Sequence, residues 1–276
     1  MNSAIHQAAA AILAADGLLI TAGAGMGVDS GLPDFRGNEG FWKAYPVVAQ
    51  LGLSFAKMAD PTWFQNDPHL AWAFYGHRLN LYRRTVPHDG FAKLLAWAAN
   101  KPAGYFVFTS NVDGHFQKAG FDPERIVECH GSIHHFQCVE SCTSSIWDAT
   151  DEQITVDEKK FRAGEPLPRC RHCEGMARPN IMMFGDYSWN AERSHAQHER
   201  FLQWLGTFTK KSARLTVIEL GAGTAIPTVR YTSESAVEQL RGNLIRINPR
   251  EHSVPTGHFS MATGALDGIR QLEIYL

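Results

Sequence analysis

Short apolar runs alternate with longer segments of helical periodicity along most of the chain. The apolar runs are rich in β-branched or aromatic residues and end in small or polar residues, a pattern typical of buried parallel strands. They cover residues 17–23, 105–111, 125–131, 215–223 and 243–249. Helical patterns lie between them, at residues 90–100, 191–211 and 233–242. Strands that alternate with helices predict an α/β fold, with a doubly wound, Rossmann-like parallel sheet.

The N-terminal segment is rich in alanine and predicts an amphipathic helix. Its apolar face would hold Ile5, Ala8, Ala9, Ile12 and Leu13. The segment lacks the basic start and leucine-rich core of a signal peptide, and no apolar run approaches the ~20 residues that span a bilayer. We therefore expect a cytoplasmic protein.

Two regions interrupt the alternation of strand and helix. Residues 38–86 are rich in aromatic residues and helical in character, and residues 132–185 hold two cysteine pairs in a polar stretch. We expect these regions to form a small lobe, a helical insert plus a cysteine module. The Rossmann-like domain would then comprise residues 1–37, 87–131 and 186–276. Ligands of open α/β sheets bind outside the carboxyl ends of the strands, so such a lobe would form a wall of that crevice.

Composition changes this picture little. The 276 residues carry a net charge of −2, so we expect neither a nucleic acid nor an anionic membrane as a partner. The oligomeric state stays open, and a monomer is compatible with the sequence.

Four of the five cysteines form two closely spaced pairs, Cys138 with Cys142 and Cys170 with Cys173. Two such pairs supply the four thiolates of a tetrahedral structural zinc site. Free buried thiols are the alternative, and His134, His135 or His172 could compete as a ligand. We interpret Cys129 as a small buried hydrophobic residue.

Small and polar residues recur where the predicted strands end. A glycine run, residues 23–27, follows the first strand; without G-x-G-x-x-G spacing, it fits either a phosphate-binding loop or a tight turn. Because parallel strands end at one edge of a sheet, we expect these side chains to share one crevice. The candidates after the later strands are Ser110, Asn111, Asp113, His130, Gly221, Gly223, Thr224 and Asn248.

Several motifs occur in an order that resembles the sirtuins, the NAD-dependent protein deacylases. They are "GAGMGVDSGLPDFRG", "TSNVDGHFQKAG", "CHGS", the two cysteine pairs and "RPNIMMFGD". The resemblance extends from about Thr21 to Asn248 and is to bacterial-type enzymes. It implies NAD and one structural zinc ion as cofactors, and acylated proteins or peptides as substrates.

The resemblance also implies a role for individual residues. His130 would be the catalytic base, with Asn111 and Asp113 beside the nicotinamide and ribose. Phe35 would shield the reacting carbon from water. The implied NAD-binding set is Gly23, Ala24, Gly25, Asp34, Phe35, Arg36, Ser110, Asn111, Asp113, Gly221, Gly223, Thr224 and Asn248. The products would be free lysine, nicotinamide and O-acyl-ADP-ribose.

The segment 178–189 resembles the one that pairs with an extended peptide substrate. Met182, Met183, Phe184 and Gly185 would line the acyl-lysine tunnel there. Tyr75 and Arg78 share one face of a predicted helix and resemble the Tyr-x-x-Arg pair of class III sirtuins, which binds succinyl- or malonyl-lysine. A solvated arginine and a packed tyrosine are the alternative interpretation.

Three residues depart from the family pattern. Gly27 stands where serine is common, Ser110 where glutamine is, and Ala222 within the usual Gly-Thr-Ser. These changes favour weaker NAD binding, or a divergent enzyme that acts as an ADP-ribosyltransferase or NAD hydrolase. A non-catalytic module that binds NAD or acyl-lysine is a further alternative, but the joint presence of Asn111, Asp113 and His130 argues against it.

Overall fold

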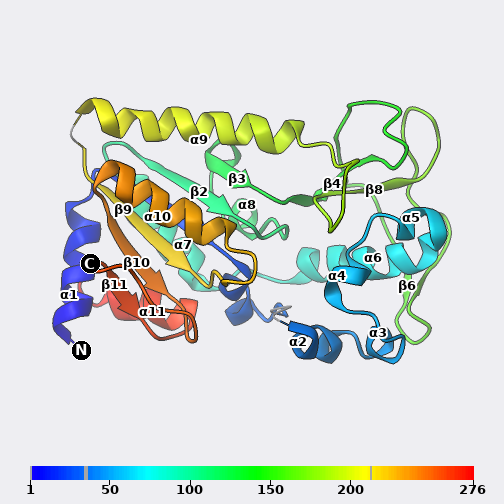
Figure 1. The fold of residues 1–276 in the computed structure, drawn as a ribbon, viewed down its shortest axis with the longest axis horizontal. Helices are drawn as coiled ribbons and strands as arrows, with labels where there is room; N and C mark the ends of the chain where they lie inside the picture. The colour runs from blue at the N-terminus through cyan, green and yellow to red at the C-terminus, as the bar shows by residue number, and fades with distance from the viewer. Residues whose placement is uncertain (1, 34–36, 212) are drawn as a thin grey trace.

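Six buried apolar runs form one parallel sheet. The computed structural model describes residues 2–33, 37–211 and 213–276, and orders the strands β11-β10-β9-β1-β2-β3 (Figure 1). Every residue of β1, β2 and β9 is buried, as expected for strands covered by helices on both faces. The bounds are β1 Gly17–Ala22, β2 Tyr105–Thr109, β3 Ile126–Glu128, β9 Leu215–Leu220, β10 Asn243–Ile247 and β11 Phe259–Met261.

The strand order reverses between β1 and β9. These two central strands pair in parallel, and the chain then continues outward on both sides of them. In a doubly wound sheet this reversal leaves a crevice beyond the carboxyl ends of the two strands, because their connections leave in opposite directions. The topology thus defines where a ligand can bind.

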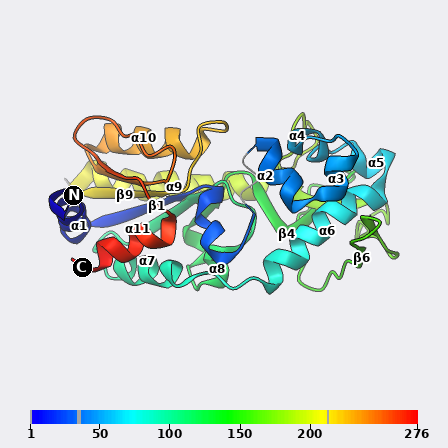
Figure 2. The same cartoon turned by 90° about the horizontal axis from the view of Figure 1, so that it is seen from below.

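Two groups of helices cover the two faces of the sheet (Figure 2). Apolar residues of the first group pack on one face, with Phe91, Phe116 and Ile269 in the core; those of the second pack on the other, around Phe201 and Val229. The first group is α1 Asn2–Ala14, α7 Asp89–Ala99, α8 His115–Lys118 and α11 Ala265–Glu273, and the second is α9 Glu192–Lys211 and α10 Thr228–Leu240.

The predicted α/β fold is confirmed, with three local differences. The edge strand β11 was not predicted, and α10 begins at Thr228 instead of residue 233. Leu13 is 58% exposed, whereas Ala8 and Ile12 are buried, so its predicted place on the apolar face of α1 was wrong. The stripe of α1 that contacts the rest of the protein is narrower than the sequence pattern indicated.

A small lobe with its own core lies beside the sheet, at the right of Figures 1 and 2. Trp72, Phe74, Tyr75 and Phe136 are buried in this core. Its strands form the antiparallel sheet β5-β4-β8 and the hairpin β6-β7. The helices are α2 Gly37–Ala44, α3 Pro46–Gln50, α4 Phe55–Met58, α5 Trp63–Asn66 and α6 Pro68–Arg84; the strands are β4 Gly131–Cys138, β5 Trp147–Asp148, β6 Val156–Asp157, β7 Arg162–Ala163 and β8 Ala177–Ile181.

Short 3₁₀ turns complete the fold: η1 Ala24–Met26, η2 Val28–Ser30 and η3 Pro123–Arg125.

The exact residue boundaries between the sheet domain and the small lobe stay a prediction. Within the described ranges, no helix combines the length and the apolar character needed to cross a bilayer.

Candidate active site

One cavity of about 620 Å³ lies where the sheet meets the small lobe. It opens beyond the carboxyl ends of β1, β2 and β9, at the reversal of strand order. Most of the residues predicted from the strand ends line it together. These are Gly23, Ala24, Ser110, Asn111, Asp113, His130, Gly221, Gly223 and Thr224.

Two glycine turns, one after β1 and one after β9, pack directly against each other. A Cβ atom on Gly23 would lie 2.8 Å from the Cα of Ala222, and one on Gly221 would lie 2.4 Å from the Cα of Gly25. Gly221 also has a φ of +60°, which side chains rarely adopt. The Gly25 N–H donates to the Gly221 carbonyl at 3.1 Å, so Gly25 joins the two turns without lining the cavity. Because of these contacts, the backbone of both glycine turns forms part of the cavity wall without side chains that cover it.

Asn111 ties the end of β2 to the first glycine turn. Its Nδ2 donates to the Gly23 carbonyl at 3.0 Å, while its own N–H donates to the Thr109 hydroxyl at 3.0 Å. That hydroxyl in turn donates to the Ala22 carbonyl. Asn111 is therefore held in one orientation at the cavity wall.

Asp113 is a buried carboxyl group at the same wall. Burial raises the pKa of Asp113 to about 6, although a hydrogen bond from the His115 N–H to Oδ1, at 2.9 Å, acts in the opposite direction. A carboxyl group with this pKa is ionised at pH 7 and titrates close to neutrality. It can accept hydrogen bonds from a ligand in a site with little water.

His130 joins β3 to β4 and also lines the cavity. Burial lowers the pKa of His130 below its ordinary value, and a hydrogen bond to the Ser110 backbone partly offsets this effect. The ring is therefore neutral at pH 7, and the nitrogen that does not face Ser110 can accept a proton. A neutral imidazole beside a cavity has the properties of a general base.

Helix α6 supplies the wall on the side of the small lobe. Arg78 is 7% exposed, and its Nε and Nη2 donate to the Tyr82 hydroxyl at 3.0 and 2.9 Å. The buried Tyr75 hydroxyl has no hydrogen-bond partner among the described residues. Tyr75, Arg78 and Tyr82 all line the cavity, so this wall offers hydrogen-bond donors to a ligand.

The segment after β8 forms the opposite side of this pocket. Ile181, Met182, Met183 and Phe184 line the cavity, whereas Gly185 does not. The Met182 N–H donates to the His130 carbonyl at 3.0 Å, which fixes this segment next to His130. The buried pair of Arg178 with Asp186 holds the turn that follows.

Asn248 and Thr224 both make hydrogen bonds within the protein, and their predicted contacts with NAD stay a prediction. Asn248 is fully buried and does not line the cavity; its Nδ2 donates to the Ala222 carbonyl at 2.8 Å and its Oδ1 accepts from two backbone N–H groups. Its place at a strand end suits a structural link as well as a ligand. Thr224 donates through both its N–H and its hydroxyl to Oε1 of Glu251.

Sequence reasoning missed several residues of the cavity wall. Arg250 and Glu251 follow Asn248 after one proline, and their charges after a strand end were the available signal. The apolar wall residues Leu32, Phe55 and Val112 carried no comparable signal. The predicted NAD-binding residues Asp34, Phe35 and Arg36 lie outside the described residues.

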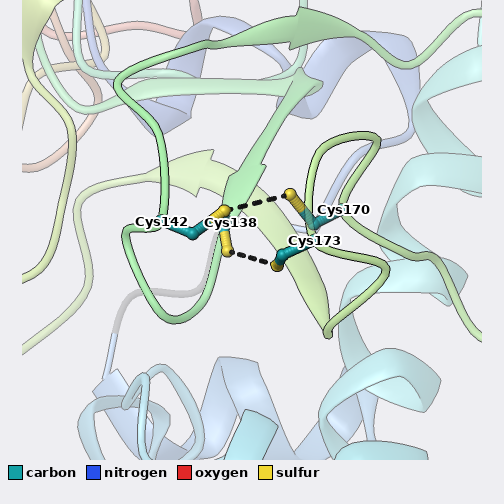
Figure 3. A group of neighbouring side chains, drawn as sticks. All are labelled: Cys138, Cys142, Cys170 and Cys173. Atoms are coloured by element: carbon teal, nitrogen blue, oxygen red, sulfur yellow. Dashed lines mark hydrogen bonds between the residues drawn. The ribbon is translucent and has the colours of Figure 1, made fainter.

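The four paired cysteines converge in the small lobe (Figure 3). Their sulfur atoms all lie within 4.8 Å of one another, with Sγ–Sγ distances of 3.7 Å for Cys138–Cys173 and 3.6 Å for Cys142–Cys170. Tetrahedral zinc with bonds of about 2.3 Å requires sulfur atoms about 3.8 Å apart. The cluster therefore forms a four-cysteine zinc site, and none of its cysteines lines the cavity.

The other candidate ligands of the metal lie elsewhere or at its edge. His172 Nδ1 is 3.7 Å from Cys142 Sγ, while the His134 ring contacts the Asp113 carbonyl instead. Cys129 is half-buried against the sheet, where burial raises the pKa of its thiol to about 12. It packs against the core of the sheet, as predicted, but is only partly buried.

Comparisons with known proteins agree with this geometry. A model of the Sir2 family matches residues 23–205. An NAD-dependent protein deacylase of Thermococcus kodakarensis is 35% identical over 164 residues, which span 59% of this chain and 58% of that protein. An NAD-dependent protein deacylase of Thermus thermophilus is 26% identical over 262 residues, 92% of this chain and 87% of that protein.

A solved structure of a Sir2 homologue mutant in complex with ADP-ribose has the same fold. It matches with a TM-score of 0.70 at 22% identity, over 98% of this chain and 95% of that one.

Proposed function

The chain belongs to the Sir2 family, and on that basis we propose that it is an NAD-dependent protein-lysine deacylase. The observation that carries the proposal is the single cavity that joins His130 and Asp113 to the two glycine turns. The relatives from Thermococcus and Thermus are named for the same activity.

The cavity wall is suited to NAD. Gly23, Ala24 and Gly223 present backbone to the cavity where a pyrophosphate would lie, at the reversal of strand order. Asn111 and Asp113 would hold the nicotinamide and its ribose through hydrogen bonds. When bound, NAD supplies ADP-ribose as the acceptor of the acyl group and nicotinamide as the leaving group.

Residues of this chain would supply the proton transfer and the exclusion of water. His130, neutral at pH 7, takes a proton from a ribose hydroxyl at its accepting ring nitrogen, and such general-base catalysis contributes about 10²–10⁴-fold. Leu32, Phe55 and Met183 form apolar walls that limit hydrolysis of NAD. The products are the unmodified lysine, nicotinamide and O-acyl-ADP-ribose.

An acylated peptide would pair with the segment 178–189. Within this segment, Met182 and Phe184 are exposed directly after β8. Hydrogen bonds between backbone groups depend little on the side chains of the peptide, so this mode of binding suits substrates that differ in sequence. The acyl-lysine would then enter between α6 and residues 181–184.

We further propose that the enzyme accepts succinyl- and malonyl-lysine as well as acetyl-lysine. The buried Tyr75 hydroxyl, without a partner among the described residues, and the Arg78 guanidinium lie on one cavity wall. A carboxylate would gain charge-assisted hydrogen bonds from both. Tyr82 supports this arrangement because it orients Arg78.

The test is incubation of the zinc-loaded protein with NAD and acetyl-, succinyl- and long-chain acyl-lysine peptides, followed by mass spectrometry. Deacylated peptide with O-acyl-ADP-ribose supports the proposal. ADP-ribosylated protein, or ADP-ribose formed without peptide, would instead identify a transferase or hydrolase.

The acyl preference is tested with Arg78→Met, which should lower kcat/KM for succinyl-lysine relative to acetyl-lysine. Arg84→Met is the matched control, because Arg84 is exposed on the same helix and does not line the cavity. If the ratio of kcat/KM for succinyl-lysine to that for acetyl-lysine is the same in the parent, Arg78→Met and Arg84→Met, Arg78 has only a structural role.

A further inference from the structure

The His134 ring lies against the backbone that carries Asp113. His134 Nε2 is 2.9 Å from the Asp113 carbonyl oxygen. A carbonyl oxygen only accepts hydrogen bonds, so Nε2 must carry the proton and donate. We infer that His134 is a positioning residue that sets the orientation of the Asp113 carboxylate.

The turn after Asp113 depends on this contact. Gly114 has a φ of +70°, and a Cβ atom there would lie 2.7 Å from His134 Cδ2 and 2.9 Å from Nε2. The ring thus occupies the space above the Gly114 backbone while it binds the preceding carbonyl. The carboxylate itself is held by the His115 N–H. Two groups therefore hold Asp113: the His134 ring binds its carbonyl oxygen and the His115 N–H binds its carboxylate.

His134 does not line the first cavity but contacts a residue that does, Asp113. A second cavity of about 650 Å³ lies on the other side of the turn, lined by Asp113, Gly114, Gln117, His134 and His135 among others. Asp113 lines both cavities, whereas His134 lines only the second. A change at His134 thus leaves every wall residue of the first cavity in place and removes one support of Asp113.

The expected effect rests on the proposed function, and specifically on a contact of Asp113 with the nicotinamide amide of NAD, the group that ADP-ribose lacks. Loss of the His134 hydrogen bond should weaken binding of NAD by about 2- to 12-fold, the range for one neutral hydrogen bond. Binding of ADP-ribose, which lacks nicotinamide, should change by less than twofold. His134→Leu removes the donor at similar volume, and His134→Gln restores an N–H at the corresponding position.

The experiment is calorimetric titration of NAD and of ADP-ribose into the zinc-loaded full chain. His135→Leu serves as the matched control, because His135 lines the same second cavity without a bond to Asp113. We expect the ratio of the two dissociation constants to rise only in His134→Leu and to return toward the parent value in His134→Gln.

An unchanged ratio in His134→Leu would overturn the inference, and so would equal losses for both ligands or a failure of His134→Gln to restore the ratio. If His134→Leu does not fold, His134→Gln is compared with His134→Asn, whose shorter amide cannot reach the Asp113 carbonyl. The ratio of the two dissociation constants should then rise in His134→Asn relative to His134→Gln, and equal ratios would overturn the inference. A parent protein that binds both ligands but deacylates no peptide would refute the proposed function alone. Absence of NAD binding by the parent protein would overturn both.

Discussion

Removal of one oxygen atom, in Tyr75→Phe, should stabilise the protein and impair its action on acidic acyl groups. The Tyr75 ring is buried and stacks on Phe64 with centroids 5.6 Å apart, and it meets Phe74 edge-on at 4.9 Å. Phenylalanine keeps these contacts. Only the hydroxyl is lost, and it has no partner among the described residues.

The two effects have separate magnitudes. A buried hydroxyl without a partner costs about 1–3 kcal/mol, so its removal should raise the free energy of unfolding by about 1 kcal/mol and Tm by about 2–4 °C. A hydrogen bond to a charged group contributes about 1.5–3 kcal/mol, which corresponds to a fall of about 10- to 150-fold in kcat/KM for succinyl-lysine. The value for acetyl-lysine should stay unchanged or rise, because an acetyl group offers this hydroxyl no carboxylate.

The assay combines thermal unfolding with kcat/KM for succinyl- and acetyl-peptides of the same sequence. Tyr45→Phe is the matched control: its hydroxyl bonds to His77 Nδ1 at 3.1 Å and lies outside the cavity lining. The control should lower Tm and leave the succinyl-to-acetyl ratio unchanged. A Tyr75→Phe protein with an unchanged ratio would refute the reasoning about the substrate, and a lower Tm would refute the reasoning about the hydroxyl.

Three further predictions follow from the same structure. His130→Ala should lower deacylation by about 10²–10⁴-fold with ADP-ribose affinity retained, and turnover within a fewfold of the parent would exclude His130 as the base. Metal analysis should find one zinc ion per chain. Cys170→Ala should lower Tm and release the zinc ion, whereas Cys129→Ala should do neither. A metal-free protein of full stability would contradict this prediction. Burial lowers the pKa of His115 and of His135 to about 4. Between about pH 6.5 and pH 4 these two side chains therefore bind protons in the unfolded chain but not in the folded protein. The free energy of unfolding should fall as the pH falls through this range, by about 1.4 kcal/mol per pH unit for each histidine. In urea unfolding measured across the same pH range, His115→Phe should make the free energy of unfolding depend less on pH. An equally steep pH dependence in this variant would show that His115 does not contribute to it.

The sequence predicted the sheet and most of the cavity because both depend on local patterns. Strands such as Leu215–Leu220 read as short apolar runs, and their ends carry the wall residues. The edge strand Phe259–Met261 was missed because three residues, of which only one is buried, carry too little pattern. Asn248 shows the limit of this reasoning, since a polar residue at a strand end can turn toward the neighbouring backbone as easily as toward a ligand.

Contacts between distant segments could not be predicted from the sequence. The bond from Arg78 to Tyr82 connects residues on one helix and could have been inferred from their spacing. The approach of His134 to Asp113 depends instead on how β4 leaves the sheet, which no local pattern encodes. The same holds for Glu251, which reaches the cavity only because β10 lies beside β9.

The pairing of β1 with β9 also has a consequence for how the protein folds. Leu18 pairs with Thr216, about 200 residues further along the chain, so this contact closes the longest loop in the sheet and should form late in folding. The two glycine turns meet only after that closure, and the cavity is absent from any intermediate that lacks it. ADP-ribose should therefore bind the completed fold alone, stabilise it in proportion to the logarithm of ligand concentration, and slow unfolding without accelerating the earlier steps of refolding.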